Sequence, residues 1–240
     1  MSYLRVWTTV DEDTDVVAVF PSAGSGCMRL RALAERQPAG RAVIGVQLPA
    51  REDRLAEPPA ETADAVAVAV AAELGALPRR RLGLLGISFG GLLGYLVARQ
   101  FEHVDTPVDE LCVAAARSPG FWLDYPVEPP EGEIDEMIGR GWQESPLGTY
   151  AAKVLRGDLR LAAGYDIGPE VLQSTPLRTV SGGRDVVVTE EQMREWPRHA
   201  AHFRGQRVLD VSHRQFLDQD VLDPMIDDLF TAPRAQEVPC

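Results

Sequence analysis

Residues 81–99 of the chain read Arg-Leu-Gly-Leu-Leu-Gly-Ile-Ser-Phe-Gly-Gly-Leu-Leu-Gly-Tyr-Leu-Val-Ala-Arg. The first seven are an apolar run typical of a buried strand, and the residues from Phe89 onward favour a helix. Between them lies the G-x-S-x-G motif Gly86-Ile87-Ser88-Phe89-Gly90. In a strand–turn–helix context this motif forms a nucleophile elbow, in which glycines leave room for the turn. We therefore predict that Ser88 is a nucleophile; a structural glycine-rich turn is the alternative.

The composition restricts the class of protein. With 240 residues, 45% hydrophobic and 25% charged, the chain suits one globular domain. It contains no apolar stretch near the roughly 18 residues of a membrane span, and its first residues lack a signal-peptide pattern. A formal net charge of −12 argues against nucleic acid. Three widely spaced cysteines, Cys27, Cys112 and Cys240, indicate neither a disulfide framework nor a C-x-x-C metal site and favour a cytoplasmic protein.

Strand-like runs alternate with helical ones along most of the chain. This alternation predicts an α/β protein with a mostly parallel sheet flanked by helices, and with the elbow it predicts the α/β-hydrolase fold. We expect strands at 15–20, 42–48, 81–87, 110–116, 177–182 and 206–211. We expect helices near 26–35, 61–77, 89–101, 189–196 and between 213 and 230. Residues 1–240 are interpreted as a single domain whose last ten residues form a loose tail.

The segment from about 118 to 164 interrupts this alternation. Its first third is rich in proline, glycine and acidic residues, and residues 150–161 favour a helix. Insertions at this place in serine hydrolases usually form a lid over the acyl site, so we predict a lid insertion here. Its aromatic side chains either line the acyl site or simply pack: Phe121, Trp122, Tyr125 and Trp142.

A serine nucleophile needs a base, and in α/β-hydrolases that base is a histidine on a loop after a late strand. His213 directly follows the predicted strand 206–211, so we predict that it is the base. The remaining histidines precede any suitable acid or sit in polar helix ends, and are interpreted as surface residues: His103, His199 and His202.

The base needs a carboxylate that orients it, placed between the serine and the histidine in the chain. Asp185 follows the predicted strand 177–182 through two glycines that let the chain turn. We therefore predict Asp185 as the third member of the triad. The alternatives are Asp158, Asp166 and Asp210.

The oxyanion formed by attack needs two N–H donors. The Phe89 N–H, directly after the nucleophile, is the first candidate. The second is expected in the loop 20–26, where small residues allow close approach of the backbone, and we predict the Ala23 N–H. Cys27 lies near this loop without a base to serve it, and we interpret it as an inert thiol.

Arginines gather at three places on this acidic chain: Arg29 with Arg31, Arg51 with Arg54, and Arg79 to Arg81. One interpretation is a set of solvated side chains. The other is a docking edge for an acidic partner.

Several of these segments resemble motifs of the type II thioesterases, stand-alone α/β-hydrolases of polyketide and nonribosomal peptide pathways. Val19–Gly24 is similar to the family's F-P-Y-A-G-G loop, and Val46–Arg54 to its V-Q-L-P-G-R-E-x-R segment. Leu155–Leu159 resembles the family's L-R-A-D-L, and Gly86–Gly90 its G-H-S-M-G elbow. Gly182–Asp185 and His213 stand at its acid and base positions.

The resemblance implies a serine thioesterase that hydrolyses acyl thioesters carried on the phosphopantetheine arm of an acyl or peptidyl carrier protein. It implies the triad of Ser88, Asp185 and His213, an acyl-enzyme, and no metal or organic cofactor. The chain departs from the family pattern at Ile87, which replaces a histidine, and at Arg214-Gln215, which replaces bulky apolar residues. A cyclase or acyltransferase, a small-molecule carboxylesterase and a non-catalytic binding protein are the alternatives.

Overall fold

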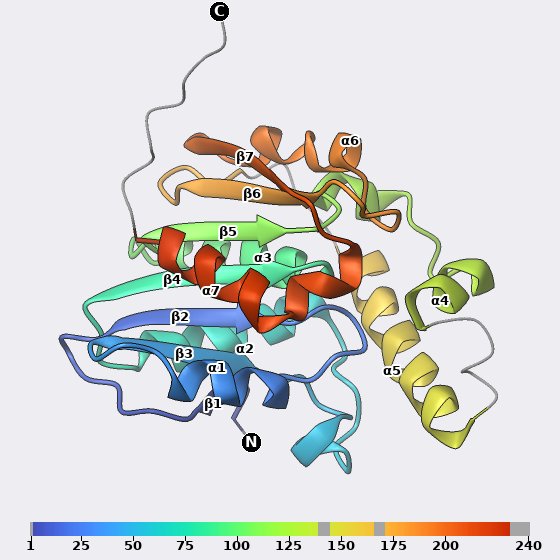
Figure 1. The fold of residues 1–240 in the computed structure, drawn as a ribbon, viewed down its shortest axis with the longest axis horizontal. Helices are drawn as coiled ribbons and strands as arrows, with labels where there is room; N and C mark the ends of the chain where they lie inside the picture. Colours follow the sequence, from blue (N-terminus) through green and yellow to red (C-terminus); the bar gives the residue numbers. More distant parts are fainter. Residues whose placement is uncertain (1, 139–144, 166–170, 231–240) are drawn as a thin grey trace, which may run out of the picture.

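The computed structural model describes residues 2–138, 145–165 and 171–230, and Figure 1 shows their arrangement. Seven strands form one sheet in the order β1-β3-β2-β4-β5-β6-β7. β1 is antiparallel to β3, and every other neighbouring pair is parallel. The strands are β1 (Leu4–Val6), β2 (Asp15–Phe20), β3 (Arg41–Val46), β4 (Arg81–Ile87), β5 (Glu110–Ala114), β6 (Leu177–Gly182) and β7 (Phe203–Leu209). The predicted α/β class is confirmed.

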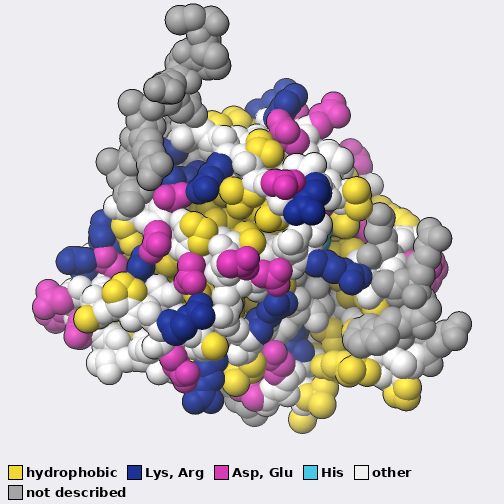
Figure 2. Space-filling model, viewed as in Figure 1, with side chains coloured by type: hydrophobic (Ala, Val, Ile, Leu, Met, Phe, Trp, Pro, Cys, Tyr) yellow, Lys and Arg dark blue, Asp and Glu magenta, His cyan; other side chains and the backbone are white. Residues whose placement is uncertain are grey.

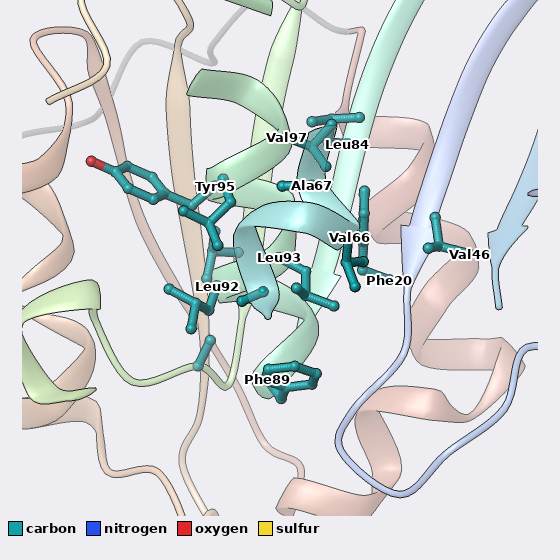
Figure 3. Close-up of a cluster of buried hydrophobic side chains, with 14 of the residues drawn as sticks. Phe20, Val46, Val66, Ala67, Leu84, Phe89, Leu92, Leu93, Tyr95 and Val97 are labelled. Atoms are coloured by element: carbon teal, nitrogen blue, oxygen red, sulfur yellow. The ribbon is translucent and has the colours of Figure 1, made fainter. Parts of the chain in front are cut away.

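Helices cover both faces of the sheet, which explains why every residue of β2 is buried. α1 (Arg31–Glu35) and α7 (Gln219–Asp228) lie on the face turned toward the viewer in Figure 1. α2 (Ala63–Gly75) and α3 (Phe89–His103) lie on the opposite face. Two hydrophobic cores result, one under each layer of helices. Figure 3 shows part of the core under α2 and α3, where Leu93 of α3 lies near Val66 of α2 and Phe20 of β2.

Between β5 and β6 the chain leaves the sheet, where the lid insertion was expected. It forms η3 (Pro119–Leu123), α4 (Glu131–Ile138) and α5 (Pro146–Ala163). In Figure 1, α4 and α5 lie beyond the carboxyl ends of the central strands. In open parallel sheets this edge is where ligands bind.

The aromatic residues of this insertion pack against one another. The Trp122 and Tyr125 rings are 5.0 Å apart between centroids, and Phe121 lies 5.5 Å from Trp122. Arg117 stacks over Phe121 at 4.5 Å. Trp122 and Tyr125 are buried, so packing explains them. The other predicted lining residue, Trp142, lies outside the described residues, as do Asp166 and the predicted tail.

The element boundaries differ from the prediction in identifiable places. β1 was not predicted, because three residues at a sheet edge leave almost no periodic signal. β7 begins at Phe203 rather than at residue 206. The expected helix 26–35 is divided into η1 (Met28–Leu30) and α1, and the closing helix begins only at Gln219, after η6 (His213–Leu217). The helix expected at 189–196 is α6 (Glu190–Met193), followed by η5 (Trp196–His199).

The interpretation of Arg51 and Arg54 as surface residues is wrong. Both are buried, at 6% and 5% exposure, because each binds a carboxylate: Arg51 binds Asp158 of α5, and Arg54 binds Glu57 in the loop that follows β3. Arg80 and Arg81 both bind Asp15. Figure 2 shows acidic and basic side chains interspersed over the face that carries α1 and α7. Within the described residues, no helix is long and apolar enough to cross a membrane.

Candidate active site

Ser88 occupies the sharp turn between β4 and α3. Its backbone has φ 55° and ψ −124°, a conformation rare for a residue with a side chain and often found at functional sites. A Cβ on Gly86 would lie 2.4 Å from the Gly90 carbonyl oxygen, and one on Gly90 would lie 2.1 Å from the Phe20 oxygen. The turn therefore requires glycine at both positions, as the motif predicts.

Three side chains from separate loops meet at the carboxyl edge of the sheet. His213 Nε2 lies 3.1 Å from Ser88 Oγ, and His213 Nδ1 lies 2.8 Å from Asp185 Oδ2. The other oxygen of Asp185 accepts hydrogen bonds from the Val187 and Val188 N–H groups, both at 2.8 Å. The carboxylate is thus fixed by the backbone on one side and faces the imidazole with the other. The structure brings together the three side chains that the sequence singled out.

The turn that presents His213 depends on its neighbours. Ser212 and Gln215 form a capping box, in which the Ser212 N–H donates to Gln215 Oε1 at 2.9 Å. The pattern Ser-x-x-Gln is a sequence signal for such a helix start. Gln215, which departs from the family pattern, therefore orders the loop beside the imidazole.

The remaining histidines have other surroundings. His199 is half-buried rather than at the surface as expected, because it packs against the rings of Tyr95 and Trp196, and burial lowers its pKa. His103 ends α3, at the opposite end of that helix from Ser88, and is exposed. His202 is exposed as well.

The alternative acids also differ from Asp185 in their surroundings. The Asp210 side chain is 88% exposed and binds Arg184. Asp158 is buried on α5 and binds Arg51 rather than a histidine.

The loop after β2 lies directly against the elbow. The close approach of Gly90 to the Phe20 and Pro21 carbonyls shows this contact, and Gly90 belongs to the first turn of α3. The Phe89 N–H is among the first four of α3, which have no acceptor within a helix. Ala23 lies in the same loop and is buried. The structure thus places Phe89 directly after Ser88, and Ala23 in a loop that contacts the elbow and lines a cleft with His213.

Side chains of the Val46–Arg54 segment form hydrogen bonds to the loop after β2 and to the residues that follow it. Gln47 Oε1 accepts the Cys27 N–H at 2.8 Å, and Glu52 accepts the Met28 N–H at 3.0 Å. Arg51 reaches both this loop and Asp158 on α5. Sequence reasoning missed that role for Arg51, although Arg51 and Asp158 both fall in segments that carry the family resemblance.

A cleft of about 290 Å³ opens beside His213 and the loop after β2. Its lining includes Ala23 and Gly24 of the loop after β2, His213, and Met137 and Leu155 of the insertion. Ser88 itself is 8% exposed.

The thiol near the loop has an inert environment. Cys27 is fully buried. Burial, together with the negative charge of Glu52, raises its pKa to about 12, so the thiol stays protonated at neutral pH. This agrees with the interpretation of Cys27 as a buried, unreactive residue.

The model of the thioesterase domain family matches residues 16–231. The chain belongs to this family. The match confirms the family resemblance drawn from the motifs and identifies the chain as a thioesterase, a hydrolase that acts on thioesters. Its strand order and the elbow between β4 and α3 are those of an α/β-hydrolase, so the predicted fold is also confirmed.

Known proteins similar to this chain include two thioesterases and a synthetase. It is 28% identical to RedJ, a thioesterase of the prodiginine pathway of Streptomyces coelicolor, with a TM-score of 0.75 over 90% of this chain and 85% of RedJ. It is 27% identical to the thioesterase TesA of Mycobacterium marinum, over 82% of this chain and 80% of TesA. It is 29% identical to the antimetabolite synthetase AmbE of Pseudomonas aeruginosa, over 76% of this chain but only 9% of AmbE.

Proposed function

We propose that this thioesterase is a type II enzyme that hydrolyses acyl groups from the phosphopantetheine arm of an acyl or peptidyl carrier protein. The observation that carries the proposal is the chain of two hydrogen bonds from Asp185 through His213 to Ser88. The biosynthetic systems of RedJ and AmbE support a polyketide or nonribosomal peptide pathway.

The first half-reaction transfers the acyl group to the enzyme. His213 Nε2 takes the proton of Ser88 Oγ as that oxygen attacks the thioester carbonyl carbon. The Ala23 and Phe89 N–H groups stabilise the negative oxygen of the tetrahedral intermediate. The carbon–sulfur bond then breaks, and the imidazolium returns its proton to the departing thiolate. An acyl ester of Ser88 and a free phosphopantetheine thiol result.

The second half-reaction releases the acid. His213 takes a proton from water, whose oxygen attacks the ester carbonyl, and then returns a proton to Ser88 as the ester bond breaks. Throughout, Asp185 holds the Nδ1 proton of the imidazole and stabilises the imidazolium. These steps use side chains, backbone N–H groups and water, and we propose no resident metal or organic cofactor.

The insertion serves as the lid in this proposal. Met137 of α4 and Leu155 of α5 line the same cleft as His213, so these helices border the space where the acyl thioester must reach Ser88. A narrow arm can enter such a cleft while the carrier protein remains outside.

The test is a single-turnover assay followed by intact-protein mass spectrometry. A carrier protein loaded with an acyl-phosphopantetheine arm is incubated with wild-type enzyme and, in parallel, with the Ser88→Ala variant. We expect the wild type to remove the acyl mass and to release the free acid, and the variant to leave the carrier acylated.

Product identity tests the acceptor. Release of a cyclised or amine-captured product would show that the enzyme transfers the acyl group instead of hydrolysing the thioester. The carrier protein could also stay acylated with every acyl group tried while simple oxygen esters are hydrolysed rapidly. That result would show that the substrate is a small ester and not a carrier-bound thioester. If the Ser88→Ala variant were as active as the wild type, Ser88 would not be the nucleophile.

A further inference from the structure

A buried ion pair connects the loop after β3 to helix α5. Arg51 Nη1 and Nη2 donate to the two carboxylate oxygens of Asp158, each at 2.6 Å. The side chains are 7% and 2% exposed, and the two residues are 107 positions apart in the chain. Bidentate pairs of this kind are the most directional of side-chain hydrogen bonds. The pair therefore fixes the position of α5 relative to the loop.

Both partners also bind the loop that carries Ala23. Asp158 Oδ2 accepts the Gly24 N–H at 2.7 Å, and Arg51 Nη1 donates to the Ser25 carbonyl oxygen, 3.3 Å away. These are the two residues that directly follow Ala23. The ion pair thus holds the backbone on the carboxyl side of the proposed oxyanion donor.

Helix α5 presses on the same loop. Gly24 has φ +75°, and a Cβ built on it would lie 3.2 Å from the Leu155 Cβ of α5. Leu155 and Asp158 are three positions apart, so they share one face of the helix. One helix face therefore supplies both the packing contact and the hydrogen-bond acceptor that fix Gly24.

Stability alone does not explain a charged pair at this place. Buried ion pairs lose hydration and are often no more stabilising than apolar residues of similar size. What the pair offers is geometry, because the acceptor for Gly24 and the donor to Ser25 are held in one rigid unit.

We infer that Arg51 and Asp158 are positioning residues for the oxyanion hole. Through them, the geometry of the oxyanion hole depends on the position of α5. The inference rests on the proposed function, since it takes the Ala23 N–H as an oxyanion donor. It gives α5 a role beyond covering the cleft: a displacement of this helix carries Asp158 away from Gly24 and disturbs the donor.

Asp158→Asn is the most direct test. Oδ2 now accepts from Gly24 and Arg51, and Oδ1 accepts from Arg51, so either orientation of an asparagine amide sets an NH₂ group against a donor. We expect kcat for thioester hydrolysis to fall about 10²-fold, as for a misplaced catalytic group. KM should stay near its wild-type value, since the lost interaction acts in the transition state.

A second readout avoids the carrier protein. A fluorophosphonate that labels Ser88 uses the same oxyanion hole, so its rate constant should fall for Asp158→Asn as kcat does. If the wild type labels rapidly but leaves acyl-carrier thioesters intact, the proposed function fails, and the comparison of labelling rates still tests the positioning role. An Asp158→Asn protein that is folded and labels at the wild-type rate would overturn the inference.

A control variant tests for general disruption of this region, and a second variant replaces Asp158→Asn if that protein does not fold. Glu57→Gln breaks a neighbouring ion pair, formed with the buried Arg54, which donates to the Gln47 carbonyl rather than to the oxyanion loop. This variant should keep the wild-type labelling rate, and an equal loss in it would overturn the inference. If Asp158→Asn does not fold, Arg51→Lys keeps a cation beside Asp158 but loses the bidentate geometry. Folded Arg51→Lys should label more slowly, and labelling at the wild-type rate would contradict the inference.

Discussion

Arg214, the residue after the predicted base, donates a hydrogen bond to the main-chain oxygen of Met137 at 3.0 Å. Met137 lies in the last turn of α4, where carbonyl groups have no partner within a helix. A guanidinium there also meets the negative end of the helix dipole. The His213 loop and the insertion are therefore linked directly, at a position where the sequence departs from the family pattern.

Removing this link should loosen α4. A favourable charge at a helix C-terminus contributes about 0.3–1 kcal/mol, so Arg214→Ala should make opening of the last turn about two- to fivefold more frequent. Hydrogen exchange of amides in residues 131–138 would report this change. Arg198→Ala removes an exposed arginine that binds Glu195 and is a suitable control. Unchanged exchange in Arg214→Ala would show that the hydrogen bond does not restrain α4.

Gly90 provides a test of the contact between the elbow and the loop after β2. In Gly90→Ala the new Cβ would lie 2.1 Å from the Phe20 oxygen, a backbone atom that cannot rotate away. We expect a destabilised protein, by about 1–3 kcal/mol as for overpacking, and a large loss of esterase activity. Urea unfolding and hydrolysis of an activated ester measure both effects. Gly157→Ala, where a Cβ has open space, should be tolerated.

The environment of Cys27 predicts its reactivity. Because burial raises its pKa to about 12, little thiolate is present at pH 8, and solvent does not reach the sulfur. Iodoacetamide should therefore leave Cys27 unmodified in the native protein and alkylate it in urea, as judged by peptide mass spectrometry. Rapid alkylation of Cys27 in the native state would point to a reactive thiol beside the oxyanion loop.

The sequence predicted the sheet and the triad side chains for physical reasons. Buried parallel strands must be apolar on both faces, so β2 and β4 stand out as continuous runs. Ser88, Asp185 and His213 each follow a strand, and the carboxyl ends of parallel strands meet at one edge. Local patterns and chain order were sufficient to predict that these three side chains lie together.

The contact between Arg51 and Asp158 could not be predicted in this way. It joins residues 107 positions apart, and neither stands in a stretch whose composition indicates burial. A charged residue is normally expected at the surface, and only the fold provides the partner that makes its burial favourable. The edge strand β1 was missed for a different reason, because three residues carry too little pattern.

Asp15 should make stability depend on pH in acid. Hydrogen bonds from Arg81 and Arg80 hold the pKa of this carboxyl well below its usual value of 3.8. The folded state therefore favours the charged form, and the stabilisation is present above pH 3.8 and is lost as the pH falls toward the folded pKa. Asp15→Asn should cost about 1.5 kcal/mol at pH 7, the low end for charged hydrogen bonds, because Arg80 and Arg81 are partly exposed. Urea unfolding at pH 7 and at acid pH should show the difference from wild type shrinking in acid. The exposed Asp13→Asn serves as the control.

The Asp185→Asn variant tests whether Asp185 or the alternative acid Asp210 orients His213. The asparagine oxygen can still accept the Val187 and Val188 N–H groups, which sets its NH₂ group toward His213 Nδ1. A donor at that place favours the tautomer with the proton on Nε2, which cannot accept the proton of Ser88. We expect kcat to fall about 10⁴-fold, as in other triads with this change, in a protein of nearly wild-type stability. Asp210→Asn, at a side chain 88% exposed, should leave kcat unchanged. If Asp210→Asn abolished turnover and Asp185→Asn did not, the acid would have to be reassigned.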